Sequence, residues 1–163
     1  MKIEESTIVE TNDYRVIIYP ASRPFTSKES KVITEKLYDF LATWAAHGKA
    51  LSSSFKIEKN QFIIVCVDED VEAASGCSID ELSGVLREIE QEFQLGLFDR
   101  MKATFVENGE VKTLKLQDFR NGLKNGEISK NIEVFDFSKN TYLAFLSDFL
   151  LPLRRSWAGI YVD

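Results

Sequence analysis

The chain has 163 residues, 44% of them hydrophobic and 28% charged, which is the composition of a globular domain with a real core rather than of a disordered chain. Its formal net charge of −6 disfavours nucleic acid as a partner, because an acidic surface repels a phosphate backbone. Two cysteines are too few for a disulfide-built scaffold, so we expect a soluble protein of the reducing cytoplasm.

The sequence also argues against export and membrane insertion. The first ten residues, MKIEESTIVE, are polar and acidic and lack the apolar stretch of a signal peptide. The most apolar late segment, YLAFLSDFLLPL, is short and contains Asp148 and Pro152, so it is not expected to span a bilayer.

The first predicted elements are a strand and a helix. Residues 14–19, YRVIIY, are a short β-rich run. Thr26 and Glu29 form a capping box, which predicts a helix starting directly after Thr26. Apolar residues then recur at helical spacing as far as Trp44, and Gly48 is expected to stop the helix.

A hairpin follows, in which residues 51–58 and 61–68 flank a two-residue turn at Lys59-Asn60. With that turn, alternation assigns one face to Phe55, Ile57, Phe62, Ile64 and Cys66 and the opposite face to Ile63, Val65 and Val67. Both faces are apolar, so each needs a cover. We expect the two helices to cover one face, and the C-terminal segment or another subunit to cover the face of Ile63, Val65 and Val67.

The sequence SIDE at residues 78–81 is a second capping box, with Ser78 as the expected cap of a helix that runs to about residue 94. Residues 100–107 are a predicted strand, and Asn108-Gly109 is a strong turn that returns the chain as residues 111–116. The first 107 residues therefore follow the order of a ferredoxin-like βαββαβ unit, an α+β fold with two helices on one face of an antiparallel sheet. In that order the strand at 61–68 is interior.

The remainder, residues 108–163, is a C-terminal α/β extension. A short helix ending at glycine is predicted in LQDFRNGLKNG, a strand in IEVFDF and a further helix in NTYLAFLSDFLL. No domain boundary is stronger than the loop near residue 108. We therefore expect a single domain, with the extension packing on the 1–107 unit or at an interface.

Two segments resemble parts of ATPases. FIIVCVDED is an apolar strand followed by acidic residues, like a Walker B strand, and ELSG matches the start of an ABC-transporter signature. No G-x-x-x-x-G-K-[ST] loop occurs in the chain, so nothing would hold the β- and γ-phosphates of ATP. ATP hydrolysis is not expected.

Five stretches together resemble an uncharacterised bacterial family whose members often carry the name "ABC transporter ATPase". They are YPASRPF, WAAHGKALSSSFKI, FIIVCVDE, ASGCSIDEL and FDR. The resemblance covers nearly the whole chain, and SGCSID is its most specific part. It implies no established activity, cofactor or catalytic residue, and the missing phosphate loop makes the ATPase label a misnomer.

Cys77 is the main chemical candidate, because a thiolate before a predicted helix is favoured by the helix dipole and by free N–H groups. The topology brings His47 and Asp68 to the same end of the molecule, whereas Arg23 falls at the other end. That placement permits a Cys–His pair with an acidic residue orienting the imidazole. The alternative is structural: Cys77 is a small, mostly buried residue, Ser78 caps the helix and His47 satisfies helix-end carbonyls.

The remaining candidates each have a structural alternative. Arg154, Arg155 and Trp157 could bind an anion or a carboxylate, or pair with the acidic surface. Ser78 could contact a ligand or only cap its helix. Cys77, His47 and Asp68 do not form a metal-ligand spacing motif, so no metal is expected.

Two functional hypotheses follow, and a third is compatible with both. The first is a non-enzymatic binding or interaction module whose partner is another protein or a second copy of the chain. The rival is a thiol-dependent enzyme or redox sensor that uses Cys77 with His47. The third is ligand binding between the helices and the C-terminal segment.

Overall fold

The computed structural model describes residues 13–162, so the amino-terminal decapeptide, which argued against a secretory signal, lies outside the described residues. Two 3₁₀ turns, Leu153–Arg155 and Trp157–Tyr161, follow the last strand. The strands and helices are β1 (Arg15–Pro20), α1 (Ser27–Ala42), β2 (Ala45–Ala46), β3 (Lys49–Ala50), β4 (Ser53–Glu58), β5 (Phe62–Val67), α2 (Gly76–Phe93), β6 (Lys102–Glu107), β7 (Glu110–Lys115), α3 (Leu116–Asn125), β8 (Glu133–Phe135), α4 (Tyr142–Asp148) and β9 (Leu150–Pro152).

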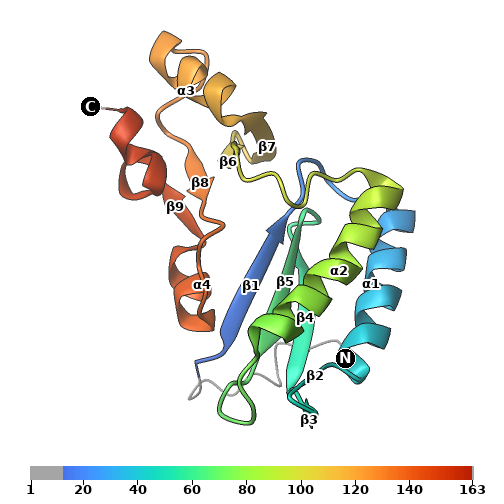
Figure 1. Ribbon diagram of the computed structural model, residues 1–163. Coiled ribbons are helices and arrows are strands. Elements are labelled where there is room, and N and C mark those ends of the chain that lie inside the picture. The colour runs from blue at the N-terminus through green and yellow to red at the C-terminus, as the bar shows by residue number, and fades with distance from the viewer. Residues whose placement is uncertain (1–12, 163) are drawn as a thin grey trace.

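The described chain is a mixed α/β structure with antiparallel sheets. The first sheet has the strand order β1-β5-β4, with α1 and α2 on one face and α4 on the other (Figure 1). The strand order does not confirm the ferredoxin-like topology. The third predicted strand is interior, as expected, but the fourth, β6, joins a second sheet of order β7-β6-β8-β9.

Helix α1 begins as predicted, with the capping box of Thr26 and Glu29. The helix ends earlier than predicted, at Ala42, and Gly48 does not stop it. Instead His47 and Gly48, both with positive φ, form the turn between β2 and β3, since glycine adopts this backbone at little cost. Trp44 therefore lies outside the helix, where its buried indole N–H donates to the carbonyl of Ser78 (2.8 Å).

The N-cap of helix α2 lies three residues before the predicted cap. The N-cap is Ser75, whose hydroxyl accepts from the amide of Ser78 (3.1 Å), while the Ser78 hydroxyl bonds back to the amide of Ser75 (2.8 Å). The prediction that Ser78 caps the helix is therefore wrong. A serine at the third helical position completes the capping box in place of the usual glutamate.

The β4–β5 hairpin carries the largest error in the predicted register. Lys59 and Asn60 do form a two-residue turn with positive φ, closed by the Gln61 amide donating to the carbonyl of Glu58 (3.1 Å). Strand pairing then starts at Glu58 with Phe62, so Gln61 is an extra, unpaired residue of this hairpin. A one-residue shift reverses the face of every side chain in a strand.

The faces of the first sheet are consequently the reverse of the prediction. Ile63, Val65 and Val67 pack with Phe55 and the helices in one core. Phe62, Ile64 and Cys66 lie on the opposite face with Val16 and Ile18, where they are covered by Phe135, Tyr142, Phe145 and Phe149. The C-terminal segment thus covers the second face within one chain, and Cys66 is a core residue, as expected.

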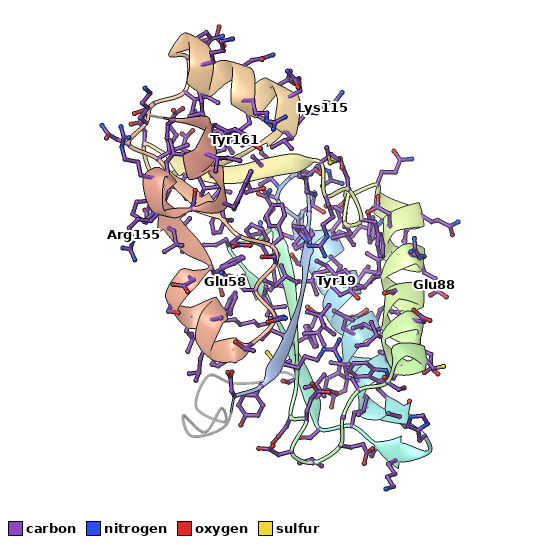
Figure 2. All side chains as sticks on the ribbon, turned by 60° about the vertical axis from the view of Figure 1, so that its left-hand side comes forward. Tyr19, Glu58, Glu88, Lys115, Arg155 and Tyr161 are labelled. Atoms are coloured by element: carbon purple, nitrogen blue, oxygen red, sulfur yellow. The ribbon has the colours of Figure 1, made fainter. Side chains whose placement is uncertain are left out.

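The C-terminal region forms a third core around the second sheet, built from β6, β8, α3 and the two 3₁₀ turns. Side chains fill the space between these elements (Figure 2). The predicted Asn108-Gly109 hairpin is confirmed, and so is the stop of α3 at Gly126, which has a φ of 81°. Among the described residues no helix is both long and apolar enough to cross a membrane.

Candidate functional site

Strand β1 lies at the edge of the first sheet, with β5 on one side only. Backbone groups of alternate residues point to opposite sides of a strand in its plane. The Val16 amide donates to the carbonyl of Asn140 (2.9 Å) rather than to β5, so the backbone groups of the even-numbered residues from Tyr14 to Pro20 face the outer edge.

A short piece of chain covers the first part of this edge. Asn140 accepts from Val16, the Tyr142 amide donates to the carbonyl of Tyr14 (2.8 Å), and Arg15 faces Thr141 in an isolated antiparallel bridge. This contact ends at Asn140 and does not continue along β1.

Two basic side chains cover the far part of the edge, where no strand lies beside β1. The Arg100 guanidinium donates to the carbonyl of Ile18 (2.9 Å), and the Lys102 ammonium donates to the carbonyl of Pro20 (2.7 Å). The two donors are two residues apart in sequence, as are their two acceptors. These side chains satisfy carbonyl groups that a neighbouring strand would otherwise satisfy.

Between the contact with residues 140–142 and the contacts of Arg100 and Lys102, two backbone groups on the outer edge of β1 have no hydrogen-bond partner among the described residues. Within the part of the chain that the structure describes, neither the Val16 carbonyl nor the Ile18 amide has a hydrogen-bond partner. Both residues are only 2% exposed. A buried backbone N–H without a partner is rare in folded proteins, because its desolvation is not compensated.

An open cavity of about 590 Å³ reaches this gap. Its wall includes Arg15, Val16, Ile18, Arg100, Ser138 and Asn140. A second hollow of about 310 Å³ shares Arg100 and Ser138 with it and extends to Lys102 and Trp157. The larger cavity lies between the edge of β1 and residues 137–141.

Of the three cations that line the larger cavity, Arg100 is the one without an ion-pair partner among the described residues. Arg15 lies 3.9 Å from a carboxylate oxygen of Glu69, and Lys139 lies 3.3 Å from one of Asp136. Arg100 is exposed and bonds only to two carbonyls, those of Ile18 and Phe137 (3.3 Å). Its remaining N–H groups can donate to an anion.

Lys102 is held more deeply than Arg100, with 4% of its surface exposed. Its ammonium donates to Pro20, to the Ser22 hydroxyl (2.9 Å) and to the Gly96 carbonyl (2.8 Å), so its three donors are engaged. Burial lowers the pKa of Lys102 to about 8, against the opposing charge of Asp99. These contacts tie the end of β1 to the loop before β6, which is a structural role.

The structure brings the elements that carry Cys77, His47 and Asp68 to one end of the molecule (Figure 1). Cys77 is exposed in the first turn of α2, so the expected burial of this thiol is wrong. His47 is exposed in the β2–β3 turn, and Asp68 is half-buried, with a carboxylate oxygen accepting from the Asp70 amide (3.1 Å). No hydrogen bond or ion pair joins any two of the three.

The other candidates fall in separate places. Ser78 is buried and bonded within the capping box. Arg154 and Arg155 are exposed on a 3₁₀ turn, and Figure 2 labels Arg155. Trp157 lines the smaller hollow and donates to the carbonyl of Phe135 (2.9 Å). Within residues 13–162, no group of three His, Cys, Asp or Glu side chains is arranged to hold a metal ion.

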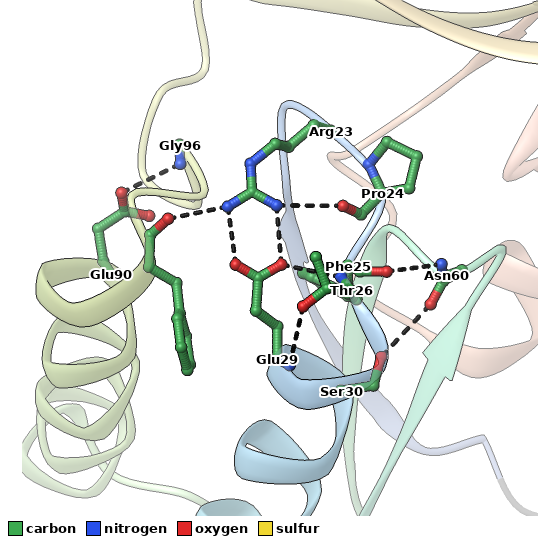
Figure 3. A network of polar contacts seen from close by, with 10 residues as sticks. Arg23, Pro24, Phe25, Thr26, Glu29, Ser30, Asn60, Glu90 and Gly96 are labelled. Carbon is green, nitrogen blue, oxygen red and sulfur yellow. Dashed lines mark hydrogen bonds and ion pairs between the residues drawn. The ribbon is translucent and has the colours of Figure 1, made fainter.

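Arg23 lies at the opposite end from Cys77, as predicted, and joins the two helices (Figure 3). Its guanidinium bonds both carboxylate oxygens of Glu29 (2.8 Å each) and the carbonyl of Phe93 (2.9 Å) at the end of α2. The ion pair with Arg23 and the capping bonds of Thr26 lower the pKa of Glu29 to about 2. This network fixes the two helices rather than forming a site.

Sequence reasoning missed the edge of β1, Arg100 and Asn140. A basic pair spaced by two residues, Arg100 and Lys102, directly before an apolar run was the available signal. Both residues fall within the strand predicted at residues 100–107, so the pattern gave no reason to place them at the edge of another sheet. Comparison with protein-family models, with curated proteins and with solved structures found no match.

Proposed function

We propose that the protein is a non-enzymatic binding module that holds a short stretch of peptide backbone at the edge of β1. The observation that carries the proposal is the pair of open backbone groups, the Val16 carbonyl and the Ile18 amide, on the wall of the 590 Å³ cavity. Addition of a peptide to a strand edge is a recurrent mode of recognition, in which main-chain hydrogen bonds supply affinity.

The two groups match a single residue of a parallel peptide. In a parallel ladder, the carbonyl of one residue and the amide two residues later bond to the same residue of the neighbouring strand. Such a residue would donate to Val16 and accept from Ile18. These two hydrogen bonds would satisfy the Val16 carbonyl and the Ile18 amide, which otherwise depend on water.

A second copy of the chain is a poor occupant of this edge. Two β1 strands related by a two-fold axis at Ile17 would pair the same two groups with each other. The edge from Tyr14 to Val16 is already bonded to Asn140 and Tyr142, so the partner's strand would collide with that segment. A peptide of another protein, entering from the cavity, avoids this conflict.

The test is an NMR titration of the ¹⁵N-labelled full chain with a library of N-acetylated tetrapeptides that have random side chains and free C-termini. The amide of Ile18 is expected to shift on titration. Asn140→Trp should abolish the shift, because the exposed Asn140 side chain lines the cavity while its bond to Val16 is made by the backbone.

Asn131→Trp is the matched control, since Asn131 is exposed but is not on the cavity wall, and it should retain the response. The proposal would be contradicted if the library left the Ile18 amide resonance unchanged, or if it shifted that resonance equally in the wild type and in Asn140→Trp.

A further inference from the structure

We infer that the residue bound at β1 is the last residue of a peptide, and that Arg100 takes its free α-carboxylate. This inference rests on the proposed function and adds the chemical class of the ligand. It is carried by the length of the gap and by the charge at its far end.

The gap has room for only one residue along β1. On one side Asn140 occupies the edge and bonds Val16, and on the other side the Arg100 guanidinium bridges the carbonyls of Ile18 and Phe137. A peptide that continued in both directions would displace one of these covers. The C-terminal end of a peptide displaces neither cover. The residues before the last one leave through the cavity, and the last residue ends beside Arg100.

The polar groups at the two ends of the gap have the order of a terminal residue. The Val16 carbonyl accepts from the N–H of that residue, and the Ile18 amide donates to its carboxylate. The Arg100 guanidinium lies next to the position of this carboxylate, because it donates to the carbonyl of the same residue, Ile18 (2.9 Å). A guanidinium with spare N–H groups and no carboxylate partner among the described residues favours a carboxylate over a neutral amide.

The other charges of the cavity do not compete for this role. Arg15 and Lys139 are each engaged by an acidic side chain, Glu69 and Asp136 respectively. The carboxylates of Asp13 and Glu69 also line the cavity, where Glu69 faces Arg15 and Asp13 accepts from the Leu143 amide (3.1 Å). They would repel a second negative charge, which disfavours an acidic peptide lying along the whole cavity.

The experiment compares two tetrapeptide libraries on the full chain, one with free C-termini and one with amidated C-termini, with sodium acetate as a third probe. We expect the free library to shift the Ile18 amide with an apparent Kd at least about tenfold lower than that of the amidated library, a difference of about 1.4 kcal/mol. Acetate alone should bind far more weakly, because it lacks the N–H that Val16 accepts.

Arg100→Gln should remove the preference for the free carboxylate, and Arg100→Lys should restore part of it, since lysine keeps the charge but not the fork. Arg15→Gln removes a charge from the same cavity and should leave the preference within about twofold, because Arg15 is engaged by Glu69.

The outcomes separate the two claims. Equal binding of the two libraries overturns the inference and leaves the proposed function standing. Binding of neither library overturns both. A preference for the free library that survives in Arg100→Gln, or acetate binding as tight as that of the free library, also overturns the inference.

Discussion

At the residue scale, the two cysteines of the chain have opposite surroundings. Cys66 is 3% exposed on the face of β5 that the C-terminal segment covers, and burial raises the pKa of its thiol to about 12. Cys77 is exposed at the start of α2. Since the thiolate is the reactive form, Cys66 is inert in the folded protein and serves as an internal control for Cys77.

Alkylation with iodoacetamide near neutral pH should therefore modify one thiol per folded chain, at Cys77, and both thiols after unfolding. His47→Ala should leave the rate at Cys77 within about twofold, because no hydrogen bond joins the two residues. A tenfold loss of rate in His47→Ala, measured by mass spectrometry of peptides at several times, would contradict this and favour the thiol enzyme.

At the element scale, α1 and α2 are joined through one buried carboxylate. Glu29 completes the capping box of α1 and pairs with Arg23, which in turn holds the carbonyl of Phe93 (Figure 3). Arg23 is 42% exposed on its side chain, so solvent screens part of the pair, whereas the Glu29 side chain is 8% exposed. One substitution at Glu29 therefore affects the start of one helix and the end of the other.

Glu29→Gln is expected to lower the free energy of unfolding at pH 7 by about 1–2 kcal/mol, the range for a hydrogen bond to a charged group after screening. The pKa of Glu29 is lowered to about 2 in the fold from an ordinary value of 4.5. A lowered carboxyl pKa stabilises the fold above pH 4.5, and this stabilisation is lost as the pH falls towards 2.

The variant should thus lose less stability than the wild type across that range, as measured by urea unfolding at a series of pH values. Glu35→Gln, on the same helix at an exposed position, is the matched control and should behave like the wild type. An unchanged stability of Glu29→Gln at pH 7 would show that the pair contributes nothing.

At the scale of the whole molecule, local patterns predicted most elements but not the register of the β4–β5 hairpin or the sheet that β6 joins. The capping box at Thr26, the turn at Asn108-Gly109 and the stop at Gly126 are each specified by residues within one turn of chain. The bulge at Gln61 is not, because its carbonyl accepts from Ala21 (2.9 Å) and its side chain donates back to Ala21, forty positions away in sequence. No local signal reports such a contact.

The candidate site was missed for the same reason. In the predicted ferredoxin-like order, the first strand lies between two other strands of one four-stranded sheet. It therefore has no open edge at which Arg100 could lie. Strand β6 leaves that sheet to pair with β7 and β8. The side chains of Lys102, its first residue, and of Arg100, two residues earlier, reach back to carbonyls of β1. The position of Cys77 at the start of α2 follows from a local capping signal, but its exposure does not, and its predicted burial is wrong.

The most direct test of the account is native-state hydrogen exchange along β1, read residue by residue by NMR in the unliganded protein. Val16 donates to Asn140, and Ile17 and Tyr19 face β5, so these amides should be protected. The Ile18 amide has no bond to break and should exchange roughly tenfold or more faster than these neighbours, and the free-carboxylate library should slow it. Protection of Ile18 equal to that of Ile17 and Tyr19 without ligand would contradict the open edge on which the proposed function rests.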